Sequence, residues 1–283
     1  MKKTVAILLA MLMILTSLLA FTGCTGGNDQ SLEGIKKSGE LIVYTEAGFA
    51  PFEFIANGKV VGVDIAICEK IAEEIGVELV VKDVAFNTIL GAIESGKAAI
   101  GAAGITITPE RAEQVDFSMA YTTSKQYIVV KTDSTIASYA DLTGKKIGVQ
   151  LGTSSDFIIT DAINGTEDDD GNHVKGDFEG TGATVSTYAN PNLAAVNLEG
   201  NKLDAVVTDE LPAKLIVENS NGAYKCFELI YNDGSKTDES YGLCVAKGNT
   251  ELLEVINKVL TNLIETGEID KYVVYYSTEV TAD

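Results

Sequence analysis

The stretch GAAGITITPERAEQVDFS, residues 101–118, contains a change from one kind of secondary structure to another. A run of small and β-branched residues ends at Thr108, and Pro109 then favours the first turn of a helix. Arg111 falls in that first turn, where the partial positive charge of the helix terminus disfavours a cation by about 0.3–1 kcal/mol. An arginine at this place therefore predicts that a negatively charged group lies close to it.

The residues before this stretch alternate between strand and helix patterns. The segment ELIVYT, residues 40–45, is a short apolar run with turn signals on both sides, which indicates a buried strand. Four segments follow it: a helix over 64–76 that Asp64 could cap, a strand over 77–82, a helix over 88–95 and a strand over 98–106. Strands that alternate with helices predict a parallel sheet with helices on both faces.

The same alternation begins again after residue 144. Strands are expected over 145–149, 183–188 and 203–208, and helices over 155–163 and 193–198. The segments ESGKAAIGAAG (94–104) and EGNKLDAVVTD (199–209) echo each other at corresponding places in the two halves. We therefore expect two similar α/β lobes.

Two crossings are expected to join the lobes. The segment 121–130 runs from the first unit into the second, and the chain is expected to return near 226–233. A strongly amphipathic helix that ends at Gly267 then needs a sheet to pack on, which is most simply that of the first lobe. The expected division is lobe 1 over 38–121 plus 230–283, and lobe 2 over 126–225. Two crossings between two lobes make a hinge.

The N-terminal residues 1–23 have the features of a secretion signal. Two lysines precede an uncharged apolar stretch, residues 5–21, which is short for a membrane span. The signal closes as FTGC, which resembles the bacterial lipoprotein box, in which the cysteine, here Cys24, becomes the lipidated first residue. A plain secreted protein is the alternative. Residues 24–37 are expected to form a tether.

The charge balance excludes some classes of partner. The chain has 21 Lys and Arg residues against 41 Asp and Glu residues, a net charge of −20. Without residues 1–23, which carry two lysines and no acid, the net charge becomes −22. A chain this acidic is not expected to bind nucleic acid or an anionic membrane surface. Cys68 is expected in the core, and a Cys226–Cys244 disulfide stays open.

Candidate site residues follow the predicted strands, because ligands of open α/β sheets bind beyond the carboxyl ends of the strands. Those ends lead to Glu46, Phe49 and Phe52, to Thr106, Thr108 and Arg111, to Gln150, Thr153 and Ser154, and to Asp209.

Each of these residues also has an ordinary structural interpretation. Arg111 could pair with Glu113 or Asp116 on the surface. Thr153 and Ser154 could simply cap a helix, as could Asp209. The phenylalanines could belong to the core.

Together, however, the residues match one kind of ligand. A guanidinium and exposed backbone N–H groups suit a carboxylate, and a separate acid suits an ammonium group. Aromatic faces beside them suit a side chain. A ligand with opposite charges one carbon apart satisfies all of these groups, and such a ligand is an α-amino acid.

Five segments carry a resemblance to a known family: FAPFEF, VVGVDIAI, GITITPERAEQVDFS, DLTGKKIGVQLGTSS and DAVVTDE. Over about residues 38 to 278 the chain resembles the polar amino-acid binding proteins of ABC importers, which are extracellular solute-binding proteins of family 3. The resemblance implies the type II periplasmic-binding-protein fold, with two Rossmann-like lobes joined by a two-crossing hinge.

The resemblance also implies roles for individual residues. It assigns the ligand carboxylate to Arg111 with Thr106 and Ser154, and the α-ammonium to Asp209 with Gly104. It places Phe49 and Phe86 beside the ligand side chain and Glu46 at its far polar end.

Three positions depart from related receptors. Ala103 and Gly104 stand where histidine and lysine/arginine receptors have serines, and Gln150 replaces a lysine of glutamine receptors. Because Glu46 suits an amide or a cation, glutamine, arginine, lysine and histidine are the expected ligands. Thr153 completes the predicted binding set.

The acidic loop 168–179 has a weaker alternative interpretation. Asp168, Asp170, Asn172 and Glu179 stand at positions 1, 3, 5 and 12 of a calcium loop, but His173 occupies the place of the glycine. A solvated insertion is therefore preferred, and neither a metal nor a cofactor is expected.

Catalysis is the main competing class of function. His173, the only histidine, lies in that loop, so nucleophile–histidine pairs are not expected. A secreted dehydratase of the same fold and a sensory lipoprotein are the alternatives. The preferred hypothesis is a monomeric receptor, not an enzyme, that is lipid-anchored to the outer face of the cell membrane and delivers a polar amino acid to the permease of an ABC importer.

Overall fold

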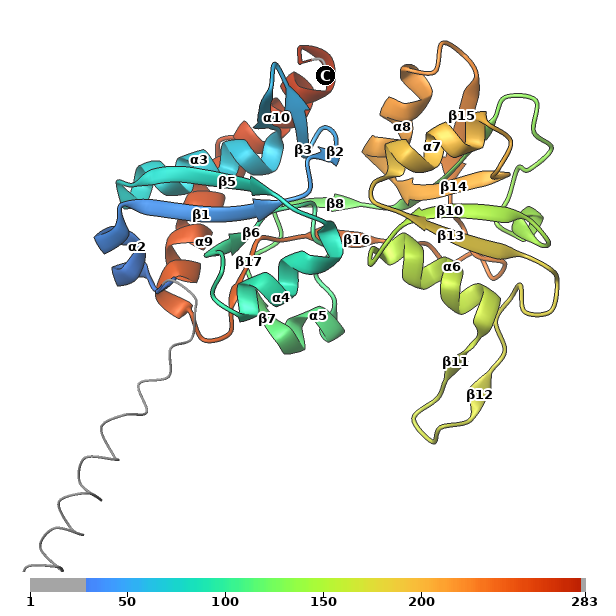
Figure 1. The fold of residues 1–283 in the computed structure, drawn as a ribbon, viewed down its shortest axis with the longest axis horizontal. Coiled ribbons are helices and arrows are strands. Elements are labelled where there is room, and N and C mark those ends of the chain that lie inside the picture. The colour runs from blue at the N-terminus through green and yellow to red at the C-terminus, as the bar shows by residue number, and fades with distance from the viewer. Residues whose placement is uncertain (1–28, 281–283) are drawn as a thin grey trace, which may run out of the picture.

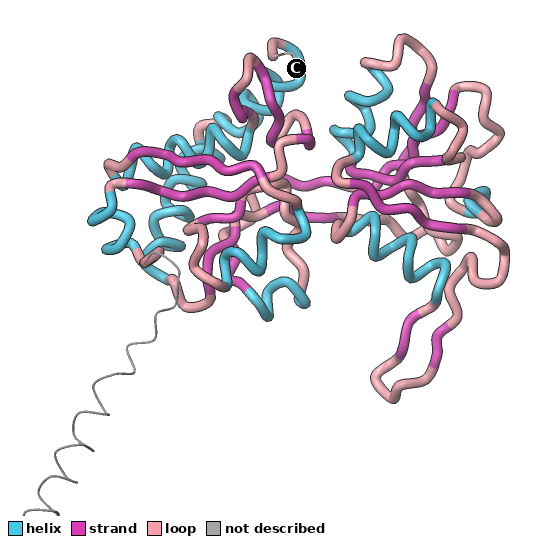
Figure 2. The backbone as a smooth tube through the Cα atoms, viewed as in Figure 1, coloured by secondary structure: helices cyan, strands magenta, loops and turns pink. Residues whose placement is uncertain are grey.

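The computed structural model describes residues 29–280, which form two α/β lobes side by side (Figures 1 and 2). Each lobe contains a five-stranded sheet with helices on both faces. The predicted two-lobed α/β fold is confirmed. The expected signal segment 1–23 and Cys24 lie outside the described residues.

The sheet of lobe 1 has the strand order β5-β1-β6-β17-β7. β1 pairs in parallel with β5 and β6, whereas β17 is antiparallel to both β6 and β7. A small antiparallel sheet of β2, β3 and β4 follows β1. The strands are β1 (Glu40–Thr45), β2 (Gly48–Phe49), β3 (Glu53–Ala56), β4 (Lys59–Val61), β5 (Glu78–Asp83), β6 (Ile100–Gly101), β7 (Val115–Phe117) and β17 (Cys244–Ala246).

Helices cover both faces of this sheet. One face carries α2 (Leu32–Ser38), α3 (Val63–Ile75), α9 (Thr250–Glu265) and α10 (Glu268–Thr278), and the other carries α4 (Ile89–Glu94) and α5 (Pro109–Gln114). A short 3₁₀ helix, Phe86–Thr88, precedes α4. In α9, apolar residues at helical spacing, Leu252, Ile256, Val259, Leu260 and Leu263, are all buried. The amphipathic C-terminal helix therefore packs on lobe 1 as its spacing predicts.

Lobe 2 repeats this plan with the strand order β13-β10-β14-β9-β15. Its strands are β9 (Gln126–Lys131), β10 (Lys146–Gln150), β13 (Thr184–Tyr188), β14 (Ala205–Asp209) and β15 (Tyr224–Glu228). α6 (Ser154–Asn164) covers one face, and α7 (Pro191–Glu199) and α8 (Glu210–Glu218) cover the other. A 3₁₀ helix, Ala140–Leu142, precedes β10, and a hairpin of β11 (Thr166–Glu167) and β12 (His173–Val174) projects beyond α6 (Figure 1).

Two antiparallel strands, β8 (Thr122–Ser124) and β16 (Glu239–Tyr241), connect the lobes. The first crossing lies where the sequence predicts it. The second lies later than the expected 226–233, because β15 pairs with the edge of β9 and so belongs to lobe 2. Pairing at that edge satisfies backbone groups of β9 that would otherwise face solvent. The segment expected as lobe 2, 126–225, thus cuts through β15.

Two local predictions differ from the structure close to the cavity between the lobes. Asp64 does not cap α3, since Gly62 occupies the cap position and Asp64 is buried inside the first turn. Its carboxylate accepts hydrogen bonds from the Tyr121 hydroxyl at 2.5 Å and from the Gly104 N–H at 2.9 Å. The expected strand 98–106 forms a strand only over Ile100–Gly101. The residues after it form a loop, in which Thr106 makes an isolated bridge to Tyr241.

Three features left open by the sequence are clear in the described residues. Cys226 and Cys244 are free thiols and lie in the sheets of different lobes, so they form no disulfide. Within residues 29–280, no group of three or more His, Cys, Asp or Glu residues is arranged to hold a metal ion. No helix in that range is both long and apolar enough to cross a membrane.

Candidate ligand-binding site

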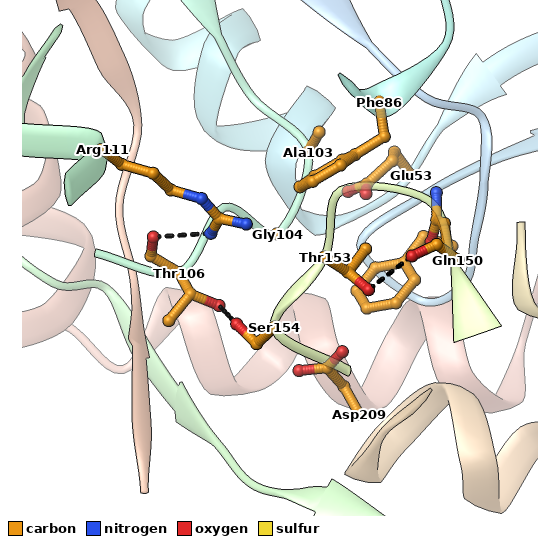
Figure 3. A pocket seen from close by; sticks show the side chains of 11 residues that line it. Glu53, Phe86, Ala103, Gly104, Thr106, Arg111, Gln150, Thr153, Ser154 and Asp209 are labelled. Atoms are coloured by element: carbon orange, nitrogen blue, oxygen red, sulfur yellow. Dashed lines mark hydrogen bonds between the residues drawn. The ribbon is translucent and has the colours of Figure 1, made fainter. Parts of the chain in front are cut away.

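A cavity lies between the two lobes (Figure 3), and its unfilled space, including the part open to solvent, is about 290 Å³. Every residue predicted to bind the ligand lines it except Glu46, and one residue that was not predicted, Glu53, lines it as well. The lining residues are Phe49, Glu53, Phe86, Ala103, Gly104, Thr106, Arg111, Gln150, Thr153, Ser154 and Asp209. The carboxyl ends of strands in both sheets therefore meet at one place, as predicted.

Arg111 is a buried cation that forms no ion pair with any residue of the range 29–280. It is the only arginine of the sequence, and its side chain turns inward from α5, which Thr108 caps. The guanidinium donates to the carbonyl oxygen of Thr106 at 2.8 Å and, across the cleft, to that of Gly152 at 3.1 Å. Among the described residues it forms no ion pair, since Asp116 pairs with Lys247 instead. Burial lowers the pKa of Arg111.

The guanidinium of Arg111 lies over the ring face of Phe86. The guanidinium carbon lies 5.6 Å from the centre of the ring, within the range of a cation–π interaction. Carbonyl oxygens and an aromatic face carry partial charges only. The remaining donor capacity of the guanidinium therefore suits an anion that enters the cavity.

Hydroxyl groups from both lobes lie beside Arg111. The Ser154 hydroxyl donates to the Thr106 hydroxyl at 3.3 Å across the cleft. Thr153 caps α6, accepting a hydrogen bond from the Asp156 N–H, and Thr153 and Ser154 place the N-terminus of this 11-residue helix at the cavity. The helix-cap interpretation is correct for Thr153, and it places an anion-binding terminus at the site.

Asp209 ends β14 on the opposite side of the cavity. It occupies the cap position of α8, yet its side chain makes no capping hydrogen bond. One carboxylate oxygen, Oδ1, accepts from the Tyr241 hydroxyl at 2.5 Å and from Nε2 of Gln126 at 3.1 Å. Burial, followed by the negative charge of Glu239, raises the pKa of Asp209 to about 8.

Glu53 was missed by the sequence analysis. Its side chain is completely buried at the cavity, and neither carboxylate oxygen has a hydrogen-bond partner in the described structure. Burial, together with the charges of Asp64, Glu46 and Asp209, raises the pKa of Glu53 well above its ordinary value. In the sequence, the two-residue period of a strand places Glu53 on the face opposite Phe52 and Phe54, which predicts that it faces solvent. The available signal for a site residue was a single acid between two phenylalanines.

Glu46 was predicted to meet the far end of the ligand but does not line the cavity. Its carboxylate instead accepts hydrogen bonds from two side chains of lobe 2, Gln150 at 3.2 Å and Asn190 at 3.4 Å. Burial raises the pKa of Glu46 to about 7. Glu46 thus holds the lobes together beside the site.

Gly104 has a conformation that suits a close approach to the ligand. Its φ of +53° lies in the left-handed region, and a Cβ atom there would come within 2.8 Å of the Phe49 ring. Its N–H is taken by Asp64, so only its carbonyl oxygen is left to accept from a ligand. Phe49 and Phe86 both belong to the cavity wall, as predicted.

Comparison with known proteins identifies the family. The model of "Bacterial extracellular solute-binding proteins, family 3" matches residues 41–279. The chain belongs to this family. The match covers both lobes and both crossings, so the family-3 fold and the cavity described above are parts of one matched unit.

Three relatives show how far the likeness to family 3 extends. The arginine-binding extracellular protein ArtP of Bacillus subtilis is 29% identical over 89% of this chain and 90% of its own length. A crystal structure of the amino acid ABC transporter substrate-binding protein AbpA from Streptococcus pneumoniae, bound to L-arginine, is 31% identical, with a TM-score of 0.75 over 87% of this chain and 97% of that chain. The ancestral amino acid-binding protein AncCDT-1, a precursor of cyclohexadienyl dehydratase, is 32% identical, with a TM-score of 0.73 over 87% and 99%.

Proposed function

We propose that this family-3 protein is the receptor of an ABC importer for a basic amino acid, with L-arginine as the first candidate. The orphan carboxylate of Glu53 is the observation that carries the choice of ligand. Arg111 and Asp209 suit the two charged groups that every amino acid carries, whereas Glu53 remains without a partner. A ligand with a second cation supplies that partner.

The carboxylate end of the ligand is assigned to the side of the cavity formed by Arg111. There the guanidinium comes from lobe 1 and the N-terminus of α6 from lobe 2, so an anion between them draws the lobes together. The Ser154 hydroxyl, which donates to Thr106 in the described structure, would turn its proton to this anion. Arg111 already reaches across to Gly152, which indicates that the closed form is the one described.

The ammonium end is assigned to Asp209. One of its oxygens is used by Tyr241 and Gln126, which leaves Oδ2 for the ligand. The carbonyl oxygen of Gly104 and the hydroxyl of Thr106 are further acceptors on the same cavity wall. Three acceptors match the three N–H groups of an ammonium.

The side chain of the ligand is assigned to the region between Phe49, Phe86 and Glu53. An aliphatic chain between aromatic rings that ends in a guanidinium fits these groups, because Arg side chains combine an apolar stem with a charged tip. Aspartate and glutamate would place a second negative charge near Glu53. Burial disfavours the ionised form of Glu53 in the empty site. A ligand cation would stabilise that form and would then pair with a carboxylate that is shielded from water.

The cellular setting is part of the same proposal. A lipid on Cys24 would hold a monomeric receptor at the outer face of the membrane. The tether would be shorter than the expected 24–37, because α2 (Leu32–Ser38) packs on lobe 1. The ABC permease would then receive the amino acid from the closed form. The family description as extracellular supports a place outside the cytoplasm.

A dehydratase is the second candidate, because a protonated, buried acid such as Glu53 is suited to act as a general acid. The likeness to a dehydratase precursor gives a further reason to test it. Turnover of prephenate or arogenate would support this function. The absence of turnover, combined with tight binding of an amino acid, would support the receptor.

The ligand is testable by a thermal-shift screen of the twenty amino acids, ornithine and cystine, followed by calorimetry. A ligand that binds only the folded state stabilises it by about 2.7 kcal/mol at one hundred times its Kd. We expect L-arginine to give the largest shift. A larger shift with glutamine contradicts the basic ligand, and no shift with any compound contradicts an amino-acid receptor.

Substitution of Glu53 tests the observation on which the choice of a basic ligand rests. The Glu53→Gln variant should lose at least about tenfold in arginine affinity, or 1.4 kcal/mol, and should lose little for glutamine. The Glu40→Gln variant removes an exposed acid of the same lobe and should bind as the unmodified protein does. Equal losses for both ligands would contradict a specific role of Glu53 toward the side chain.

A further inference from the structure

Glu239 lies on the crossing strand β16, outside the cavity wall. It contacts one group assigned to the ligand ammonium directly, Thr106, and a second, Asp209, through the amide of Gln126. The Thr106 hydroxyl donates to its Oε2 at 2.8 Å. Nε2 of Gln126 donates both to its Oε1 at 3.0 Å and to Oδ1 of Asp209 at 3.1 Å. One buried amide thus bridges two carboxylates, one from the hinge and one from lobe 2.

The first contact sets the direction of the Thr106 hydroxyl. A hydroxyl has one proton and two lone pairs. Because the proton points to Glu239, the lone pairs are left for the Ser154 hydroxyl and for the cavity. Thr106 is therefore arranged as an acceptor, which is what an ammonium donor requires.

The second contact fixes Gln126. Its amide oxygen accepts from the Ser155 hydroxyl, and its backbone N–H donates to the Thr237 hydroxyl at 2.8 Å. The amide group is therefore held with its NH₂ toward the acids. This arrangement keeps Asp209 and Glu239 close together, and neither acid forms an ion pair with a lysine or arginine of the described residues.

The other polar groups around Asp209 do not neutralise it. Tyr241 on β16 donates a hydrogen bond, Arg111 on α5 lies across the cavity, and Glu53 on β3 adds a further acid. Burial and the charge of Glu239 outweigh these donors and keep the pKa of Asp209 near 8. At neutral pH the empty site therefore holds a proton on Asp209, and this proton has no place once an ammonium binds.

We propose that Glu239 is a positioning residue of the ammonium subsite: it orients the Thr106 hydroxyl and couples capture of an amino acid to release of a proton from Asp209. The proton passes from Asp209 to water, and an N–H of the ligand takes its place. The inference rests on the proposed function, since it requires an α-ammonium group, but it does not depend on which side chain the ligand carries.

Calorimetry of L-arginine binding in buffers of different ionisation enthalpy measures the protons released. When a cationic side chain binds beside Glu53, the proton of Glu53 also passes to water, and that contribution is common to all variants that retain Glu53. At pH 7 the unmodified protein should release more protons than the Glu239→Gln variant, in which burial alone remains to raise the pKa of Asp209. Below pH 8 the affinity of the unmodified protein should rise more steeply with increasing pH than that of the variant, by up to a further tenfold per pH unit.

Two further variants complete the test. Asp238→Asn removes the neighbouring, exposed charge of the same segment and should leave both the proton count and the pH profile unchanged. Glu239→Asp keeps the charge and should restore most of the pH dependence. Arginine binding with the same proton release in the unmodified protein and in Glu239→Gln overturns the inference. If none of the amino acids binds the unmodified protein, the proposed function fails instead.

Discussion

The two lobes share one plan of construction but contribute opposite chemistry. Each sheet has three parallel strands followed by two strands in antiparallel pairing, and each is covered on both faces. Lobe 1 supplies the cation, from the short helix α5, and the aromatic walls. Lobe 2 supplies Asp209 at the end of β14 and the open N-terminus of α6.

This difference shows why neither lobe forms a binding site alone. Among the described residues, Arg111 pairs with no anion of its own lobe. Its guanidinium donates instead to the carbonyl oxygens of Thr106 and, across the cleft, of Gly152. Asp209 lacks a cation and holds a raised pKa. A ligand with both charges completes both lobes at once, so binding and closure are linked through the same groups.

The largest effect is expected from removing the cation of lobe 1. Arg111→Ala should lower amino-acid affinity at least about a hundredfold, or 2.7 kcal/mol, because a buried carboxylate would lose its charge partner. Thermal stability without ligand should stay equal or rise, since the guanidinium is buried and has no ion pair. Calorimetry and circular dichroism measure the two quantities.

Lys97→Ala is the matched control, because it removes an exposed positive charge from the same lobe. It should leave affinity unchanged. If Arg111→Ala bound amino acids as tightly as Lys97→Ala does, the cation of lobe 1 would have no part in binding. The two lobes would then not offer opposite charges to the ligand.

The acid of lobe 2 should matter less than the cation of lobe 1. Asp209→Asn keeps the shape of the side chain and should reduce affinity by about ten- to a hundredfold, or 1.4–2.7 kcal/mol. The loss is smaller because the Gly104 carbonyl and the Thr106 hydroxyl remain as acceptors, and because removing a buried acid also removes its cost in the empty site. Glu218→Gln, which changes an exposed acid on α8, is the control. A loss larger than that of Arg111→Ala would reverse the order of the lobes.

Sequence reasoning succeeded where function depends on the ends of strands. The carboxyl ends of parallel strands must meet at one edge, so Thr106, Arg111, Ser154 and Asp209 could be brought together without coordinates. The side-chain chemistry of these residues then indicated which charges the ligand carries. The same reasoning supplied the two lobes and the first crossing.

It failed where a side chain's direction depends on tertiary packing. Glu53 begins β3 directly after Phe52, and the two-residue period places it with Ile55 on the solvent side. Ile55 is indeed exposed, but Glu53 is fully buried at the cavity. Glu46 lies at a strand end yet reaches the other lobe instead of the cavity. The place of the second crossing depended on the edge of β9, which no local pattern reveals.

The buried acids of both lobes predict how stability without ligand changes with pH. The pKa values of Asp64, Glu46 and Asp209 are raised by burial to about 6, 7 and 8. The folded protein therefore holds protons that the unfolded chain has released, and its stability falls as pH rises from about 4 toward 8. We expect a decline of about 1 kcal/mol or more per pH unit, measured by urea unfolding.

Ligand and substitution separate the contributions of the lobes. Saturating amino acid should flatten the decline between pH 6 and 8, where Asp209 is the titrating group of lobe 2. Asp209→Asn should flatten the same interval, whereas Glu218→Gln should not. A stability that rises with pH over this interval would show that these acids are ionised in the empty protein.

The smallest effect is expected from a contact between the lobes that touches no part of the cavity. The side-chain amide of Asn192, on α7, donates to the carbonyl oxygen of Gly48 in lobe 1 at 3.1 Å. Because it is exposed, its loss should weaken closure by about 0.5–1 kcal/mol and lower affinity two- to fivefold. Asn197→Ala removes a similar amide that donates at 2.9 Å to Leu193 within α7, and it should leave affinity unchanged. Small-angle scattering should show Asn192→Ala more open without ligand and equally closed with it. Equal affinities for the two variants would mean that the ligand's charges alone, and not direct contact between the lobes, hold the closed form.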